Sequence, residues 1–190
     1  MNVSATRGET QNNINTEETS GSAPENKAGT QTTNPTGNND NLNEEIKPED
    51  VVSGDVPLTG LKDFMKNIYR AIETASAKKI KLVGARRYAV DTNGERVSGN
   101  AFVMNGDKYK CMDARGKIMY ASINNSRHFY GEAIDIINNG MSFDELYDLV
   151  ILGNGDVLKL MYDHGVSAYT EVSVDDLGTN SKHIHIGTDT

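Results

Sequence analysis

The composition of this chain changes abruptly near residue 50, and this change limits how much of the chain can fold. Residues 1–50 contain no aromatic residue, ten asparagines, eight threonines and three of the four prolines, with three basic and nine acidic side chains. Such a segment cannot bury enough apolar surface to offset the entropy lost on ordering. We therefore predict that residues 1–55 are a disordered polar tail and linker, and that residues 56–190 form one domain with a single core.

Most of the negative charge belongs to this tail. The formal net charge is −8 for the whole chain, and the first fifty residues account for −6, which leaves −2 for residues 51–190. A nearly neutral domain without a basic stripe predicts no binding to nucleic acid. The single cysteine, Cys111, excludes a disulfide within the chain and is expected to be a small buried residue.

The sequence predicts neither a membrane span nor a secretory signal. No apolar run approaches the length that crosses a bilayer. The N-terminal MNVSATRGETQ has no apolar segment of the kind that a signal peptide needs. We therefore expect a protein that is made in the cytoplasm and reaches any other compartment by another route.

Apolar spacing predicts one helix and then a β-rich section. Apolar residues recur at helical spacing between Leu61 and Ile72, with Thr59 as a possible N-cap and an end near Ala77. Strand-like runs then alternate with turn signals over residues 80–123. The turn signals are Thr92-Asn93-Gly94, Asn105-Gly106 and Ala114-Arg115-Gly116. The two Asn-Gly pairs predict type I′ hairpin turns, which need a positive φ at both central residues.

The C-terminal third combines helices with strands. Ser142 and Glu145 have the spacing of a capping box, and Asn154-Gly155-Asp156 separates the helix that follows from a second helix ending at Gly165. Strand-like segments follow at SAYTEV and HIHIG. Helices and hairpins are segregated without a βαβ rhythm, so we predict an α+β fold, a small antiparallel sheet with flanking helices.

Three of the four histidines fall in two short segments, SRHFYGEAIDI and HIHIGTDT. Asp135 lies between apolar neighbours, where an unpaired charge is costly, so it needs a partner or a metal. His183 and His185 are two residues apart and share one face of a strand. Zinc accepts histidine nitrogen and carboxylate oxygen, and a catalytic zinc site uses three protein ligands. The remaining histidine, His164, ends a helix and is expected to interact with the helix dipole.

The stretch S-R-H-F-Y-G-E-A-I-D resembles the S-x-H-x-x-G-x-A-x-D motif of the zinc D-Ala-D-Ala carboxypeptidase and dipeptidase family, which groups with lysostaphin-type peptidases and Hedgehog domains. The five fixed positions are Ser126, His128, Gly131, Ala133 and Asp135. The family's last ligand is a histidine in a late strand, and the H-I-H sequence places His185 there. The resemblance covers roughly residues 120–190 and implies a catalytic domain with one zinc ion on its sheet, held by His128, Asp135 and His185. Manganese and iron are the alternative metals.

The resemblance also implies a carboxylate that moves a proton from water to the leaving amine. The residue three before His185 is Lys182, so one common family position for this acid is not filled. Phage-type members carry the acid at the end of a preceding strand, which favours Glu171. Asp175 and Asp176 are the alternatives.

Further residues are assigned by the same resemblance. His183 either stabilises the developing oxyanion, as in lysostaphin-type relatives, or packs beside the ligands. Arg87, in the GARRY stretch, is the nearest analogue of the family's substrate-binding arginine, and the alternative is an exposed strand arginine. Ser126 is grouped with Arg87 at the substrate, or orients its loop through a backbone bond. Gly131 is expected to permit an unusual φ or a close backbone approach.

The resemblance implies a zinc metallopeptidase that cuts peptide bonds in the stem peptides of bacterial peptidoglycan, as a D-Ala-type carboxypeptidase or an endolysin. The missing signal peptide and the Asn/Thr-rich tail suit a bacteriophage product, released at host lysis or carried in a virion where the tail contacts a partner. Two alternatives stay open. One is a phage structural or wall-binding protein that keeps the zinc fold without turnover, and the other is a cytoplasmic dipeptidase acting on free D-Ala-D-Ala.

Overall fold

The computed structural model describes residues 44–98, 102–121, 126–153, 155–174 and 180–188. All of these residues belong to the compact unit Thr33–Thr190. Three α-helices and two antiparallel sheets make up this part of the chain, which confirms the predicted α+β class.

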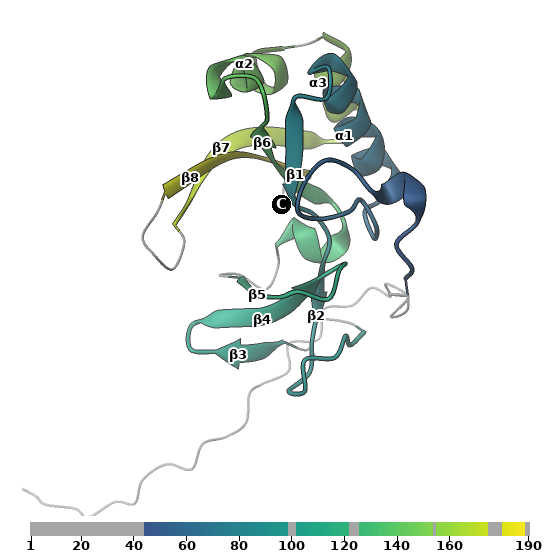
Figure 1. The fold of residues 1–190 in the computed structure, drawn as a ribbon, viewed down its shortest axis with the longest axis vertical. Coiled ribbons are helices and arrows are strands. Elements are labelled where there is room, and N and C mark those ends of the chain that lie inside the picture. Colours follow the sequence, from purple (N-terminus) through teal and green to yellow (C-terminus); the bar gives the residue numbers. More distant parts are fainter. Residues whose placement is uncertain (1–43, 99–101, 122–125, 154, 175–179, 189–190) are drawn as a thin grey trace, which may run out of the picture. The chain divides into compact units, whose positions relative to one another are not determined.

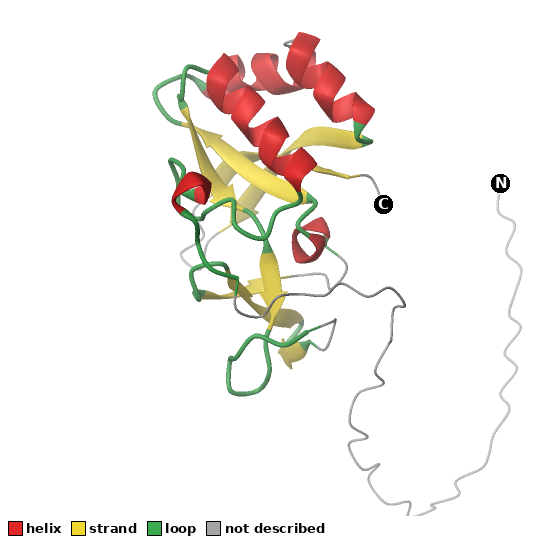
Figure 2. Cartoon of the chain, turned by 90° about the vertical axis from the view of Figure 1, so that its right-hand side faces the viewer, coloured by secondary structure: helices red, strands yellow, loops and turns green. Residues whose placement is uncertain are grey.

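The first sheet has the strand order β1-β6-β8-β7, so strands from distant parts of the chain are neighbours. Its strands are β1 (Ile80–Gly84), β6 (Ala133–Asn138), β7 (Val166–Val174) and β8 (Asn180–Thr188). Figure 1 shows the helices gathered on one side of this sheet, and Figure 2 shows them in red across its strands. They are α1 (Asp63–Ala75), α2 (Phe143–Tyr147) and α3 (Gly155–Asp163), with the π-helical segment η3 (Asp148–Gly153) between the last two.

The second sheet is built from the predicted hairpin section. Its central strand β4 pairs with β5 along one edge and with β2 and β3 along the other. The bounds are β2 (Arg87–Ala89), β3 (Val103–Asn105), β4 (Lys108–Asp113) and β5 (Ile118–Ala121). Two 3-10 turns complete the described elements, η1 (Pro48–Asp50) and η2 (Arg127–Tyr130).

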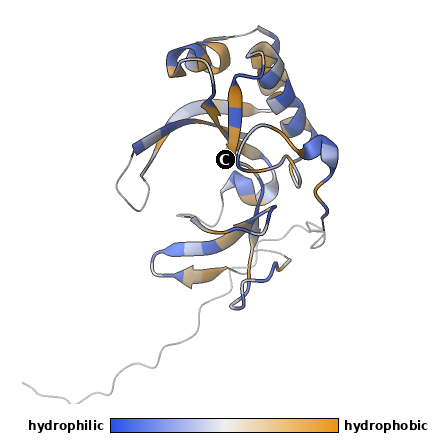
Figure 3. Cartoon of the chain, in the orientation of Figure 1, coloured by the Kyte–Doolittle hydropathy of each residue, from blue (hydrophilic) through white to orange (hydrophobic). Residues whose placement is uncertain are grey.

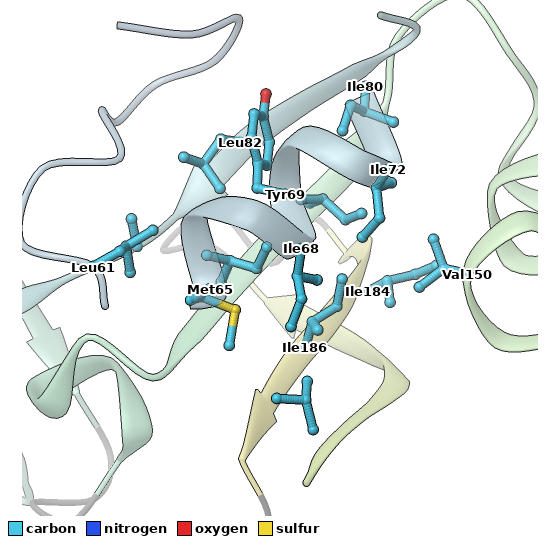
Figure 4. Close-up of a cluster of buried hydrophobic side chains, with 14 of the residues drawn as sticks. Leu61, Met65, Ile68, Tyr69, Ile72, Ile80, Leu82, Val150, Ile184 and Ile186 are labelled. Carbon is cyan, nitrogen blue, oxygen red and sulfur yellow. The ribbon is translucent and has the colours of Figure 1, made fainter. Parts of the chain in front are cut away.

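Alternation along the strands gives the first sheet an apolar face. Ile134, Ile136, Ile184 and Ile186 have no exposed surface and belong to one buried cluster with Ile68 of α1. Figure 4 shows the α1 side chains lying against those of β8, and Figure 3 shows that β1 and β6 are largely apolar. Burying each isoleucine stabilises the fold by about 1.5–3 kcal/mol. The opposite face of the same strands is therefore left for polar residues.

The helix α1 begins later than predicted. Its N-cap is Lys62, and the Thr59 hydroxyl instead donates to the buried Asp50 carboxylate at 3.4 Å. Gly60, with a φ of 77°, turns the chain between Thr59 and the helix. The prediction of Thr59 as the N-cap is therefore wrong, whereas the end of α1 at Ala75 is close to the predicted one.

The hairpin between β3 and β4 is present, but its turn is not of the predicted type. Asn105 pairs with Lys108, so the central residues are Gly106 and Asp107, and only Gly106 has a positive φ. This is the pattern of a type II′ turn. Asn93, in the other Asn-Gly pair, also lacks a positive φ. The prediction of type I′ turns is therefore wrong at both places.

The helices predicted in the C-terminal third are present. Ser142 Oγ accepts the backbone N–H of Glu145 at 3.1 Å and completes the capping box. The helix α3 ends at Asp163, and Gly165 follows with a φ of 61°, as its predicted position after the helix requires. Among the described residues, none of the helices combines the length and the apolar character that a bilayer span needs.

Residues 44–55, which composition assigns to the linker, lie against the domain. The Glu44 carboxylate accepts from the Gly60 N–H and from the Tyr88 hydroxyl, each at 3.1 Å. Asp50 is buried and accepts from the Lys66 ammonium group at 2.8 Å. The packed part of the chain therefore includes residues before the predicted boundary at 56.

Candidate metal centre

The polar face of the first sheet carries a row of residues across all four strands. Gly84 of β1 is opposite Asp135 of β6, Asp135 is opposite His185 of β8, and His185 is opposite Tyr169 of β7. Directly opposed residues have neighbouring side chains on one face of a sheet. Strand pairing therefore brings together Asp135 and His185, which are 50 residues apart in the sequence.

His128 reaches the same place from outside the sheet. It lies in η2, and Gly131, with a φ of 69°, ends that turn ahead of β6. A Cβ added at Gly131 would lie 2.3 Å from the Gly60 carbonyl oxygen. Both the backbone conformation and the available space therefore require glycine, as the sequence predicted.

His128 and His185 converge on the Asp135 carboxylate. His128 Nε2 lies 3.2 Å from Asp135 Oδ2, and His185 Nδ1 lies 2.8 Å from Asp135 Oδ1. One nitrogen or oxygen atom from each of the three residues lies within 4.8 Å of the other two. The structure thus brings the three predicted metal ligands into a group that could hold a metal ion.

A backbone carbonyl determines which nitrogen of His128 carries the proton. His128 Nδ1 lies 2.8 Å from the Ala85 carbonyl oxygen. Because a carbonyl only accepts hydrogen bonds, Nδ1 is the donor, and Nε2 presents its lone pair to Asp135. Metal-binding histidines are usually oriented by such a bond from their second nitrogen.

Burial and neighbouring groups set the protonation of this pair. Burial lowers the pKa of His128 below its usual 6.5, so the ring is neutral at neutral pH. Burial opposes ionisation of Asp135, but the hydrogen bond from His185 and the positive charge of Arg87 hold its pKa well below 3.8. The lone pair of a neutral imidazole, on His128 Nε2, therefore faces the ionised Asp135 carboxylate. A cation between the two groups would stabilise both.

Two glycines make room around the cluster. A Cβ added at Gly84 would lie 2.1 Å from Asp135 Oδ2, and a Cβ added at Gly187 would lie 3.0 Å from His185 Nε2. Sequence reasoning missed both glycines and the Ala85 carbonyl. Only the strand register shows that Gly84 lies opposite Asp135, and the sequence carries no comparable signal.

Glu171 and His183 form a second row beside the first. They are opposite each other in β7 and β8, and His183 Nε2 lies 3.1 Å from Glu171 Oε2. The same nitrogen is 3.9 Å from Asp135 Oδ1, and His183 Nδ1 is 3.3 Å from Ser173 Oγ. His183 is buried, whereas the Glu171 side chain is 44% exposed. Glu171 is thus a carboxylate that lies beside the cluster and reaches solvent.

The second sheet contributes to the site through β2. Arg87 is the first residue of β2, and its Nη2 atom lies 3.8 Å from Asp135 Oδ2. The side chain is only 23% exposed, so Arg87 is not the exposed strand arginine of the alternative reading. Ser126 is buried directly before η2 and does not cap that turn with its side chain. Its part in substrate binding stays a prediction.

The remaining residues that the sequence singled out do not enter the cluster. Asp175 and Asp176, the alternatives to Glu171, lie outside the described residues. His164 is exposed and stacks on Phe64, with 5.1 Å between the ring centroids. The predicted interaction of His164 with the helix dipole stays a prediction.

The described part of the chain therefore offers two imidazole nitrogens and one carboxylate oxygen to a metal, with a second carboxylate nearby. Imidazole and carboxylate are donors that suit zinc and other first-row metals. No family model, no curated protein and no solved structure matches this chain.

Proposed function

We propose that this chain is a zinc metallopeptidase that hydrolyses peptide bonds in the stem peptides of bacterial peptidoglycan. One observation carries most of the proposal. The lone pair of His128 Nε2, the Asp135 carboxylate and His185 Nδ1 converge on the polar face of the first sheet, and the Glu171 carboxylate lies beside them.

Zinc fits this set of donors. It binds imidazole nitrogen and carboxylate oxygen at about 2.0–2.2 Å, and catalytic sites keep a further position open. His128, Asp135 and His185 would hold the ion, with the Ala85 carbonyl orienting His128. Bound zinc would supply a Lewis acid that polarises a substrate carbonyl and lowers the pKa of water to about 7.

Glu171 is the group to which we assign proton transfer. Its carboxylate would accept a proton from the attacking water and donate it to the nitrogen of the leaving amine. The contact of 3.1 Å with His183 holds Oε2, which leaves Oε1 to face the reacting groups. This contact favours a role for His183 in positioning Glu171 over direct stabilisation of the oxyanion.

Arg87 is the group to which we assign substrate binding. A guanidinium group binds a carboxylate through two parallel hydrogen bonds, and a C-terminal D-alanine offers such a carboxylate. The Nη2 atom of Arg87 is close enough to Asp135 to place its positive charge at the edge of the site. Ser126, the buried residue directly before η2, is assigned to substrate binding together with Arg87.

The substrate class comes from the resemblance of residues 126–135 to zinc D-Ala-D-Ala peptidases. We therefore propose D-Ala-type carboxypeptidase or endolysin activity and a bacteriophage origin. In this proposal the protein is released at host lysis or carried in a virion, and the N-terminal polar tail contacts a virion partner.

Metal content and wall digestion, measured together, test this function. Purified wild type would be compared with His128→Ala on purified sacculi, with mass analysis of the released fragments. His164→Ala is the matched control, because it removes an exposed histidine that lies outside the cluster. We expect zinc and wall fragments with wild type and His164→Ala, and a loss of both with His128→Ala.

Other outcomes would contradict the proposal in distinct ways. Fragments that persist in His128→Ala or in a chelator would rule out metal-dependent hydrolysis. Bound zinc without fragments from any wall would identify a binding or structural protein. Hydrolysis of free D-Ala-D-Ala without digestion of sacculi would identify a dipeptidase.

A further inference from the structure

We infer that Asp135, Glu171 and His183 form a second and weaker site for a divalent cation, next to the site of His128 and His185. The inference on cation binding stands on the geometry of these three residues alone. A further consequence, that the second cation blocks Glu171 in proton transfer, rests on the proposed function.

The three residues converge in the same way as the first set. One nitrogen or oxygen atom from each of Asp135, Glu171 and His183 lies within 4.8 Å of the other two. His183 Nε2 is the common neighbour, 3.1 Å from Glu171 Oε2 and 3.9 Å from Asp135 Oδ1. Because Glu171 and His183 are paired residues of adjacent strands, the backbone fixes this convergence.

One tautomer of His183 can present its Nε2 atom to a metal. Its Nε2 atom faces two carboxylate oxygens, from Glu171 and Asp135, and it can carry only one proton. The Ser173 hydroxyl, 3.3 Å from Nδ1, can accept the ring proton there and leave the Nε2 lone pair to a metal. A divalent cation would then satisfy the nitrogen and both oxygens together.

Asp135 has an oxygen for each site. Its Oδ2 atom faces His128 Nε2 at 3.2 Å, and its Oδ1 atom faces His183 Nε2 at 3.9 Å. His185 Nδ1 also contacts Oδ1, at 2.8 Å. A carboxylate that is shared by two cations is a common feature of two-metal hydrolase sites. The two sites therefore share the Asp135 carboxylate, and the second site needs neither His128 nor His185.

The second site is expected to be the weaker one. Glu171 is 44% exposed, so its side chain loses conformational freedom when it binds a cation, whereas His128 is already buried and oriented. A second cation is also repelled by the first one. Zinc should therefore fill the second site only above one equivalent.

Occupancy of the second site has a functional consequence. A Glu171 carboxylate that coordinates a cation cannot accept a proton, so excess zinc would inhibit hydrolysis. The same ion would thus be required at one equivalent and inhibitory above it.

Equilibrium dialysis of the metal-free full-length protein against zinc tests the second site. We expect wild type to bind two zinc ions per chain in two separate steps, and Glu171→Gln to lose the weaker step while keeping the tighter one. His183→Asn should show the same loss. Glu95→Gln is the matched control, since it changes an exposed glutamate outside both sets and should keep both steps. Circular dichroism would verify that each variant is folded.

Saturation at one zinc ion in wild type, or a second step that persists in both Glu171→Gln and His183→Asn, would overturn the inference. The same measurements separate a failure of the proposed function from a failure of the second site. Binding of two zinc ions without wall hydrolysis would support the second site and contradict the peptidase proposal. Wall hydrolysis with a single bound zinc ion would support the peptidase proposal and contradict the second site.

Discussion

The two sheets of the domain differ in how many buried apolar side chains pack against them. Among the described residues, the first sheet shares one cluster of nineteen buried apolar side chains with the helices, whereas the cluster beside the second sheet contains only Cys111, Ala121 and Phe129. The metal-ligand candidates on strands all lie on the first sheet, and the second contributes Arg87 at the edge. The polar cluster is thus built on the more heavily packed sheet.

This difference has a physical reason. Asp135 is an ionised carboxylate that is only 7% exposed, and burying such a charge is costly unless its partners are held in place. Strands with a large apolar core behind them hold their side chains rigidly. The second sheet has only a small buried cluster behind it, and in the proposed function it supplies Arg87 for substrate binding and no metal ligand.

Matched isoleucine substitutions would show the largest contrast between the sheets. Ile136→Ala in β6 removes a side chain with no exposed surface, and we expect a loss of about 2–5 kcal/mol in the free energy of unfolding. Ile118→Ala in β5 removes a half-buried side chain and should cost about 1 kcal/mol. Urea denaturation measures both values. Equal losses would mean that the second sheet is as tightly packed as the first.

Gly84→Ala tests whether the space around Asp135 matters for metal binding. The new Cβ would lie 2.1 Å from Asp135 Oδ2, so the carboxylate has to move away from His128. We expect the zinc dissociation constant to rise about 10–100-fold, the range found when groups that orient metal ligands are removed.

Competition with a chelator would measure this constant. Gly155→Ala is the control, because a Cβ there meets no atom within 4 Å. Unchanged zinc affinity in Gly84→Ala would show that the position of the Asp135 carboxylate next to His128 does not control zinc binding.

The sequence predicted the candidate metal ligands better than it predicted their surroundings. The motif around His128 and the H-I-H segment located the three residues that converge, because their spacing is local or carried by a family pattern. The α+β class and the capping box also followed from local patterns. The capping box depends on a four-residue pattern, and the fold class depends on the order of predicted helices and hairpins along the chain.

What the sequence did not reveal depends on pairing between distant segments. That Gly84 lies opposite Asp135, and Tyr169 opposite His185, follows from strand register, which no local pattern encodes. The position of Thr59 before the apolar residues predicts an N-cap, but no local pattern reveals its contact with Asp50. The pairing of the hairpin strands into a separate second sheet likewise depends on strand pairing and not on a local pattern.

The buried His128 beside the first sheet should make the stability of the metal-free protein depend on pH in the mildly acidic range. The pKa of His128 is lowered below 6.5 by burial, so below that pH the unfolded chain binds a proton that the folded, metal-free protein does not. Stability should therefore fall as the pH drops below 6.5, with a slope of up to about 1.4 kcal/mol per pH unit from this residue. Asp135, with its pKa well below 3.8, contributes stability that is lost only under more acidic conditions.

Urea denaturation in a chelator, at several pH values from about 7 to 5, measures this slope. His128→Asn should flatten the dependence, and His164→Ala, which replaces an exposed histidine outside the cluster, is the matched control. An unchanged slope in His128→Asn would show that burial of this ring does not control the acid sensitivity. The strands of the second sheet contain no histidine and cannot supply the effect in this range.

The smallest effect on stability, and the sharpest functional contrast, is expected from two tyrosines of nearly equal exposure. Tyr169 in β7 is 48% exposed and Tyr120 in β5 is 50% exposed, so replacing either with alanine should lower the free energy of unfolding by no more than about 1 kcal/mol. Only Tyr169 extends the row of metal-ligand candidates, with its ring centroid 5.0 Å from that of His185. In the proposed function, a peptide bound at the metal would contact this ring, so Tyr169→Ala should lower kcat/KM about tenfold, or about 1.4 kcal/mol of transition-state binding, while Tyr120→Ala leaves it unchanged. Equal activity of the two variants would place the substrate away from β7, and a loss of stability in Tyr169→Ala alone would make its role structural.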